Sequence, residues 1–148
     1  MRYKQLKYNG KEYTDASKIN EILIDEDLGW FIDCEIEDVR LEIINKTLVI
    51  NSGIFYNGTF AYGCVRNIEW RYGTWENGVW YNGIWKNGIF KSGLIFEGRF
   101  ISGEILEAEV RGNADFFDCN VSQNVKDNRT KTVEENKIYK FNEIYKKL

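Results

Sequence analysis

The chain has 148 residues, of which 43% are hydrophobic and 29% are charged, and its formal net charge is −3. This composition indicates one folded domain with a hydrophobic core and excludes a disordered chain. Because histidine is absent, a Ser-His-Asp triad, a Cys-His nucleophile and a histidine-ligated metal site are excluded within the chain. The small acidic excess argues against a protein that coats nucleic acid, which would be basic.

The three cysteines, Cys34, Cys64 and Cys119, are far apart, odd in number and without a Cys-x-x-Cys spacing. This pattern is typical of a reducing compartment, where thiols serve as small apolar side chains. The N-terminal residues lack the apolar core of a signal peptide, and the apolar runs are too short to span a membrane. We therefore expect a cytoplasmic protein, located in the host cytoplasm if a phage encodes it.

The first predicted element is a helix over roughly 15–24, capped by Thr14. An acidic stretch overlaps it, with nine acidic residues and one basic residue between Glu21 and Glu42. The stretch has no calcium loop of the Asp-x-Asp-x-Asp-Gly type, so calcium binding is not predicted. We also predict no other metal, no cofactor and no catalytic residue in the chain. A solvated acidic end is the simpler interpretation, and a surface for a basic protein partner is the functional one. The residues assigned to that surface are Asp25, Glu26, Asp27, Glu35, Glu37 and Asp38.

A five-residue repeat fills the middle of the chain. Ten of the 13 glycines lie on one register between Gly53 and Gly103, and only Ile68 interrupts it. The residue two positions after each register position is always apolar and is usually aromatic. Asn-Gly pairs recur at 57–58, 77–78, 82–83 and 87–88 and supply turn chemistry, because both residues tolerate positive φ. Each unit is therefore predicted to be a short extended stretch followed by a corner.

These units predict an all-β solenoid of stacked coils. If four units close one square coil, residues 20 apart stack, and Trp70, Trp75, Trp80 and Trp85 fall on one level. That level is crowded, so either the coil widens there or some tryptophans face outward. Tryptophans in the core are the simpler interpretation. Outward-facing Trp75, Trp80 and Trp85 would form a stacking platform for glycans or bases.

The flanks of the repeat resemble the pentapeptide-repeat family. Residues 114–123, Ala-Asp-Phe-Phe-Asp followed by Cys-Asn-Val-Ser-Gln, match its unit of a small residue, Asp or Asn, and Leu or Phe, and residues 34–43 match more loosely. The resemblance implies a right-handed quadrilateral β-helix over 34–123, with slips near 44–48 and 112–114. It also implies that an inhibitor mimicking duplex DNA is one functional alternative. Residues 81–88 resemble the opening of a MORN repeat, so an array of hairpins is the rival fold.

A 20-residue stacking period would also align basic side chains on the surface. It places Arg71, Lys91 and Arg111 in one column and Arg66 and Lys86 in the next, a strip that could bind phosphate. The equal number of acids and bases among residues 53–107 argues against nucleic acid as the partner. The period also places Gly78 and Gly83 in the interior, so we expect Val to cost more there than at Gly112, near a slip.

Residues 122–132 are polar and are predicted to form a loop, and residues 133–148 are predicted to form an amphipathic helix. Ile138, Phe141, Tyr145 and Leu148 are spaced by 3, 4 and 3 residues, as on one helix face. A solenoid exposes apolar cross-sections at its ends, so residues 1–33 and 124–148 are interpreted as caps. The C-terminal helix is alternatively a docking element for a partner or a second copy, forming a homodimer.

Together these features predict a non-catalytic protein-interaction module with short helical caps. A phage-encoded protein that binds and inhibits a host protein is the most specific form of this hypothesis. An aromatic-ladder binder of glycan or nucleic acid and a DNA-mimic inhibitor of a DNA-binding enzyme are the alternatives.

Overall fold

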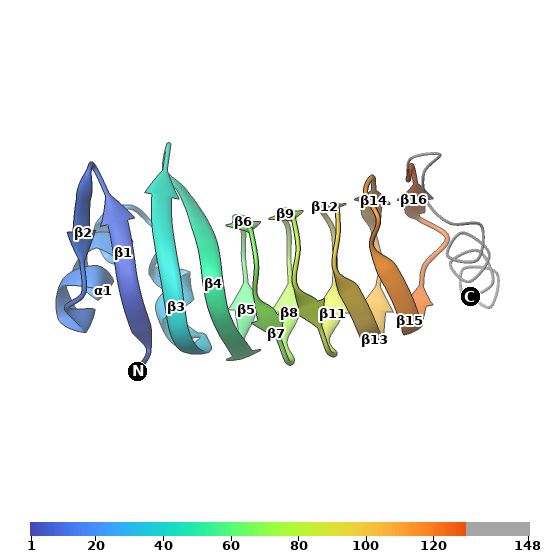
Figure 1. Ribbon diagram of the computed structural model, residues 1–148, viewed down its shortest axis with the longest axis horizontal. Helices are drawn as coiled ribbons and strands as arrows, with labels where there is room; N and C mark the ends of the chain where they lie inside the picture. The colour runs from blue at the N-terminus through green and yellow to red at the C-terminus, as the bar shows by residue number, and fades with distance from the viewer. Residues whose placement is uncertain (130–148) are drawn as a thin grey trace.

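Strands dominate the computed structural model, which describes residues 1–129 (Figure 1). The N-terminal elements are β1 (Tyr3–Tyr8), β2 (Lys11–Tyr13), α1 (Ala16–Asp25), the 3-10 helix η1 (Gly29–Asp33), β3 (Glu35–Ile44) and β4 (Thr47–Asn57). Eight two-residue strands follow: β5 (Thr59–Phe60), β6 (Cys64–Val65), β7 (Glu69–Trp70), β8 (Thr74–Trp75), β9 (Val79–Trp80), β10 (Ile84–Trp85), β11 (Ile89–Phe90) and β12 (Leu94–Ile95). The last strands are β13 (Arg99–Ile105), β14 (Ala108–Val110), β15 (Asp115–Val121) and β16 (Val125–Asp127). The strands together form a β-solenoid of about five coils, which confirms the predicted all-β solenoid.

The N-terminal end of the solenoid is covered by a small sheet and a helix. β1 pairs antiparallel with β2 and parallel with β3, and β3 forms an antiparallel hairpin with β4. Helix α1 buries Ile19, Ile22 and Leu23 against this sheet. The Asp15 side chain caps the helix by accepting hydrogen bonds from the next backbone N–H groups, so the predicted helix is confirmed but Thr14 is not its cap.

Residues 15 apart stack in the solenoid, so each coil contains three five-residue units. Trp85 pairs with Trp70 and Phe90 pairs with Trp75, both in parallel register. The prediction of four units per coil and a quadrilateral section is therefore wrong. The three-unit coil relieves the predicted crowding, because it divides the four consecutive tryptophans between two levels.

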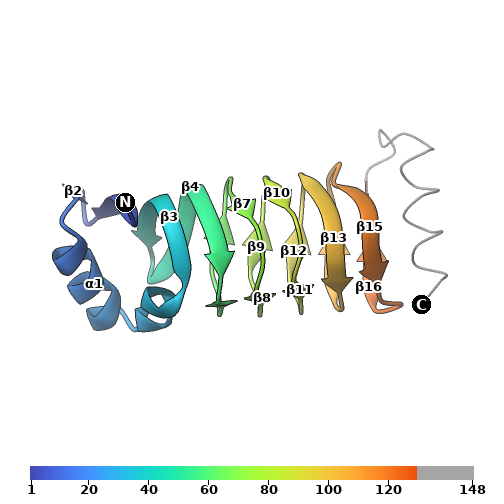
Figure 2. The ribbon, with the colours of Figure 1, turned by 90° about the horizontal axis from the view of Figure 1, so that it is seen from below.

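Three stacks of strands form the sides of the solenoid (Figures 1 and 2). Face 1 contains β4, β6, β9, β12, β14 and β16; face 2 contains β4, β7, β10, β13 and β15; face 3 contains β5, β8, β11, β13 and β15. β4 and β13 are long enough to pass around a corner, so each belongs to two faces. The rival array of separate antiparallel hairpins does not describe this region, because the strands from β5 onward pair in parallel.

An aromatic ladder runs through the interior behind face 2. The Phe55 ring stacks on Trp70 with centroids 3.9 Å apart, and Trp70 stacks on Trp85 at 4.7 Å. Phe100 and Phe116 continue the ladder toward the C-terminal end. Trp70, Trp75, Trp80 and Trp85 are all 0% exposed, so the interpretation of the tryptophans as core is confirmed.

The corners explain why glycine and asparagine recur. At Gly78 the φ angle is +130°, and a Cβ atom would lie 2.1 Å from the carbonyl oxygen of Gly63 in the preceding coil. Both the conformation and the close approach therefore require glycine. The side-chain oxygen of Asn77 accepts a hydrogen bond from the Gly78 N–H at 2.8 Å, and the other three Asn-Gly pairs repeat this contact.

The repeat becomes irregular at both ends. Residues 34–43 are not solenoid units, because most of them lie in β3, which runs antiparallel to β4. The predicted slip near 112–114 is present, since Phe100 pairs with Phe116, 16 residues later. A Cβ on Gly112 would lie 2.1 Å from the Phe96 carbonyl oxygen, as close as the contact at Gly78, but Gly112 does not have the positive φ of Gly78, so the expected smaller cost there stays a prediction. β16 occupies part of the predicted loop, and the predicted C-terminal helix lies outside the described residues.

Candidate binding surfaces

The three faces share one interior pattern but differ in the side chains that point outward. The outward residues of successive strands are Val49, Cys64, Val79, Leu94, Glu109 and Lys126 on face 1. They are Ile54, Glu69, Ile84, Arg99 and Asp115 on face 2, and Thr59, Thr74, Ile89, Glu104 and Asn120 on face 3. Among the described strands, only face 1 has four apolar residues in succession. We call Val49, Cys64, Val79 and Leu94 the apolar stripe.

Two aromatic rings border the apolar stripe. Tyr81 and Phe96 follow the inward residues of β9 and β12, and their rings stack with centroids 5.2 Å apart and planes 9° apart. Tyr81 is 45% exposed and Phe96 is half-buried. The rings therefore extend the apolar surface of face 1 toward the corner with face 2.

An open groove of about 560 Å³ lies at the N-terminal end of the apolar stripe. Val49, which is 4% exposed, and the half-buried Cys64 form the floor, and the more exposed Ile44 and Tyr81 form its sides. Asn45, Thr47 and Arg66 supply the polar rim. Ile44, Asn45 and Thr47 belong to the β3–β4 hairpin, which rises above the level of β6 and β9 in Figure 1, so the hairpin supplies part of the groove lining.

Arg66 is held at this groove with part of its hydrogen-bonding capacity unused. Its Nη1 atom donates to Asn51 at 3.1 Å and to Glu42 at 3.3 Å, and the side chain is 52% exposed. No hydrogen bond joins its Nη2 or Nε to the described part of the chain. Both groups can therefore donate to a ligand carboxylate.

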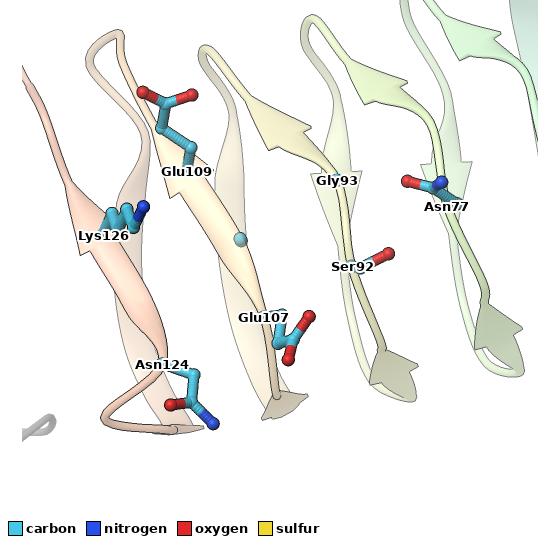
Figure 3. Close-up of a pocket in the computed structure, with 8 residues that line it drawn as sticks. Asn77, Ser92, Gly93, Glu107, Glu109, Asn124 and Lys126 are labelled. Carbon is cyan, nitrogen blue, oxygen red and sulfur yellow. The ribbon is translucent and has the colours of Figure 1, made fainter.

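A second groove, of about 550 Å³, is polar and runs along the corner between faces 3 and 1 (Figure 3). Asn77, Ser92 and Glu107 come from the corners of three successive coils, and Glu109 and Lys126 come from face 1. Hydrogen bonds from Arg111 and Asn128 hold the pKa of Glu109 below its usual value. The groove can exchange hydrogen bonds with a polar ligand through Asn77, Ser92 and Asn124.

The first three acidic residues predicted to bind a partner lie at the C-terminal end of α1 and just beyond it. Asp25 and Asp27 are exposed, whereas Glu26 accepts a hydrogen bond from the hydroxyl of Tyr8, at the end of β1. The other three acids lie at the opposite end of β1.

Glu35, Glu37 and Asp38 begin β3. Asp38 pairs with the N-terminal amine at 3.7 Å, and Glu37 accepts a hydrogen bond from the Tyr56 hydroxyl at 2.6 Å. The six residues of β1 lie between the two groups, and its five residue-to-residue steps span roughly 16 Å. The six predicted acids therefore do not form one surface.

The basic side chains predicted to form a phosphate-binding strip do not line up in the solenoid. Because the coil has 15 residues, Arg66 lies beside Tyr81 rather than Lys86, and Arg71 lies beside Lys86 rather than Lys91. Each of the five basic residues also pairs with a carboxylate: Arg66 with Glu42, Arg71 and Lys86 with Glu69, Lys91 with Glu76, and Arg111 with Glu109. With this alignment the bases form no continuous row, so the predicted positive columns are wrong.

The tryptophan platform is also wrong, because Trp75, Trp80 and Trp85 are buried in the interior. The exposed tyrosines do not replace it. Tyr62, Tyr72 and Tyr81 follow inward residues of different stacks, so they lie at different edges of the solenoid. An aromatic ladder for glycans or bases therefore has no counterpart among these side chains.

The cysteines show no sign of activation. Burial raises the pKa of the Cys34 thiol to about 11 and that of Cys119 to about 12. Burial also raises the pKa of Cys64, which is half-buried in the apolar stripe. No group of three metal-ligating side chains is found within residues 1–129. In the same residues neither helix has the length and apolar character needed to cross a membrane.

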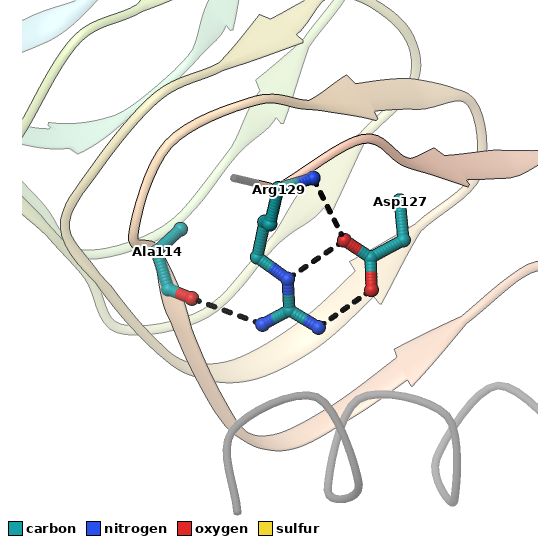
Figure 4. A network of polar contacts seen from close by, with 3 residues as sticks. All are labelled: Ala114, Asp127 and Arg129. Carbon is teal, nitrogen blue, oxygen red and sulfur yellow. Dashed lines mark hydrogen bonds and ion pairs between the residues drawn. The ribbon is translucent and has the colours of Figure 1, made fainter. Parts of the chain in front are cut away.

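Arg129 lies at the C-terminal end of the described chain and forms a buried ion pair (Figure 4). Its guanidinium donates to both carboxylate oxygens of Asp127, at 2.7 and 2.6 Å, and one nitrogen reaches the carbonyl oxygen of Ala114 at 3.5 Å. These contacts tie β16 to the irregular corner of the last complete coil. We assign them a structural role.

Comparison with known proteins adds no relatives to this description. No family model matches the chain, and no curated protein or solved structure is similar to it. The resemblances to pentapeptide and MORN repeats therefore stay predictions.

Proposed function

We propose that the protein is a non-catalytic interaction module that binds an apolar segment of a partner protein on face 1. The apolar stripe carries this proposal. Val49, Cys64, Val79 and Leu94 are four consecutive apolar residues, followed by Glu109 and Lys126, whereas the isoleucines in the rows of faces 2 and 3 are flanked by charged or polar residues. Contiguous apolar surface bordered by polar groups is typical of protein-binding sites.

The size of the surface favours a short segment over a large folded partner. Four strands at about 4.8 Å spacing extend only about 14 Å along the solenoid. A stable dimer of folded proteins buries about 800 Å² on each side, which is more than one row of four side chains and two rings can supply. An extended or helical peptide segment fits this footprint.

The parallel stacks make the surface rigid. Backbone hydrogen bonds of 2.8–2.9 Å from Arg66, Val79 and Tyr81 connect β9, β6 and β4 on face 1. A rigid surface loses little conformational entropy when a partner binds, which favours affinity from a small contact area.

The narrower hypotheses from the sequence concern the identity of the partner. A phage-encoded inhibitor of a host protein agrees with docking on face 1, because an inhibitor can act by binding its target without catalysing a reaction. A DNA mimic needs rows of carboxylates, but the outward rows on faces 2 and 3 mix acidic with apolar or polar residues. The acidic group at Asp25 and Asp27 is exposed and is a second docking surface for the same kind of function.

The test compares matched substitutions on different faces. The full chain with Leu94→Glu is used to capture proteins from a lysate of its source organism, beside the wild type and Ile84→Glu on face 2. Ile84 is 38% exposed, so both changes place a carboxylate on an outward strand position. We expect one protein to be captured by the wild type and Ile84→Glu and lost with Leu94→Glu. Equal thermal melting temperatures would show that folding is not the cause.

Two outcomes would overturn the proposal. One is a partner that binds Leu94→Glu as well as the wild type but is lost with the triple variant Asp25→Ala, Glu26→Ala and Asp27→Ala, which would move docking to the acidic group. The other is a sedimentation dimer that Leu94→Glu dissociates, which would assign face 1 to a second copy of this chain.

A further inference from the structure

The groove at the N-terminal end of the apolar stripe combines an apolar floor with a guanidinium group at its rim. The floor is Val49 and Cys64, the sides are Ile44 and Tyr81, and Arg66 lies at the edge. An apolar side chain that enters the groove replaces water mainly on Ile44, Tyr81 and the half-buried Cys64, because Val49 is only 4% exposed. At about 560 Å³ the open groove has room for one large aliphatic side chain and the backbone beside it.

The free donors of Arg66 determine the charge of the ligand. Its Nη1 is used by Asn51 and Glu42, which orient the guanidinium plane, while Nη2 and Nε make no hydrogen bond to described residues. Two parallel N–H groups of a guanidinium match the two oxygens of a carboxylate. Glu42 is only 22% exposed, and its Oε1 accepts hydrogen bonds from Asn51 and Arg66, which offset part of its charge.

The β3–β4 hairpin limits the direction from which a ligand enters. The backbone at Asn45 and Lys46 has φ angles of 50° and 64°, which form the tight turn at the hairpin tip. Asn45 at this tip lines the groove, and the floor residues Val49 and Cys64 continue through strand pairing into Val79 and Leu94. A bound segment therefore ends or turns at the hairpin and extends along the apolar stripe.

We propose that this groove binds a large aliphatic residue of a partner segment, with a carboxylate next to that residue paired to Arg66. The ligand class is an acidic, apolar peptide segment. The proposal rests on the proposed function of face 1 and adds the chemistry that the partner presents.

Three small probes separate the two parts of this recognition. N-acetyl-L-leucine carries both the aliphatic side chain and the carboxylate, N-acetyl-L-leucinamide lacks the charge, and acetate lacks the side chain. Binding of each probe to the full ¹⁵N-labelled protein is followed by amide chemical shifts. We expect N-acetyl-L-leucine to shift Val49, Cys64, Arg66 and Tyr81 and to saturate. The amide and acetate should each bind at least about fivefold more weakly, as expected for loss of a partly exposed ion pair or of the apolar contact.

Cys64 provides a second, independent readout. Its thiol lies in the floor of the groove and is half-buried, so a bound leucine side chain should slow its alkylation by iodoacetamide. Protection should follow the same order as the shifts, with N-acetyl-L-leucine the strongest. Alkylation that none of the three probes slows would overturn the proposal.

The matched variants are Arg66→Gln and Arg71→Gln. Both arginines are paired with a carboxylate on the surface, but Arg71 lies on face 2, away from the groove. Arg66→Gln should reduce the affinity for N-acetyl-L-leucine about fivefold and leave the affinity for the amide unchanged. Arg71→Gln should change neither affinity.

Equal binding of the amide and the acid would overturn the assignment of a carboxylate. No binding of any probe would overturn the groove as the anchor site, while loss of a captured partner with Leu94→Glu would still support face 1 as the docking surface. The failure of this inference is therefore distinguishable from the failure of the proposed function.

Discussion

The interior of the solenoid repeats every five residues, whereas its three outer faces do not repeat at all. Inward positions from Phe55 to Ile105 are uniformly apolar and fully buried. Outward neighbours one residue earlier range from Val79 and Leu94 on face 1 to Glu69 and Arg99 on face 2. The packing of one coil on the next constrains the interior, while the outer positions meet only neighbouring side chains and solvent.

This difference separates fold from function in the sequence. A change at an interior position is expected to act on stability, because it disturbs contacts in three coils at once. A change at an outer position is expected to act on binding, because it alters a face and leaves the stack in place. Four experiments test this contrast, beginning with the largest expected effect.

The interior corner glycines should be the most sensitive positions. In Gly78→Ala the new methyl group would meet the Gly63 carbonyl oxygen, and φ of +130° is unfavourable for alanine. We expect a loss of about 3 kcal/mol or more in the free energy of unfolding, from backbone strain and overpacking together. Urea denaturation followed by tryptophan fluorescence measures it.

Gly10→Ala is the matched control outside the solenoid. Gly10 also has a positive φ, of +76°, but no atom lies within 4 Å of its hypothetical Cβ. Alanine there should cost only about 1 kcal/mol, from conformation alone. Equal losses at both positions would contradict the close approach between coils.

The interior could be predicted from the sequence because regularly spaced glycines indicate corners and regularly spaced aromatic residues indicate the core. The five-residue register led directly to parallel stacking, to turns at the Asn-Gly pairs and to a buried row of tryptophans. The number of units in a coil was not accessible in the same way. It depends on how far each corner bends, and corner glycines with φ from 114° to 155° do not reveal that angle through their identity.

The candidate site was missed for the same reason. Val49, Cys64, Val79 and Leu94 are 15 residues apart, so a period of 20 scatters them over different columns and hides the apolar stripe. With the correct period the signal is present in the sequence. The wall formed by Ile44 is different, because it depends on a hairpin that the sequence suggested was part of the repeat.

Cysteine reactivity compares the interior with the outer surface in the native protein. Cys34 and Cys119 are buried with pKa values of about 11 and 12, while Cys64 is half-buried on face 1. At about pH 8 iodoacetamide should label Cys64 first and react with the other two much more slowly, because burial blocks access to them and favours the unreactive thiol over the thiolate. Peptide mass spectrometry locates the label. Rapid labelling of all three thiols in the native state would mean that the interior opens readily.

The tryptophans allow a finer comparison within the interior. The Nε1 atom of Trp75 donates to the Ser92 carbonyl oxygen at 3.1 Å, whereas the buried Nε1 of Trp70 has no hydrogen-bond partner among residues 1–129. Trp75→Phe loses this bond, and Trp70→Phe removes an unsatisfied donor. Both changes cost packing, so we expect Trp75→Phe to be more destabilising by about 1 kcal/mol. Trp80 and Trp85 form a second pair with the same contrast, and the reverse order in both pairs would contradict it.

The outer ion pairs should have the smallest effect on stability. A hydrogen bond from Arg71 lowers the pKa of Glu69, and one from Arg111 lowers that of Glu109. A carboxyl whose pKa is lower in the folded state stabilises the fold fully above its unfolded pKa, near about 4.3, and loses that contribution as the pH falls through the folded pKa. The melting temperature should therefore fall as the pH decreases from about 5 toward 3, and the melting temperature of Glu69→Gln should fall less steeply than that of the wild type.

The difference between the two proteins should be small and should shrink in high salt, because these carboxylates lie on the solvent-facing side of the sheet. A steeper fall in Glu69→Gln would contradict the direction of the shift. A large difference between the two proteins would mean that the outer face contributes to stability in the way that the interior does.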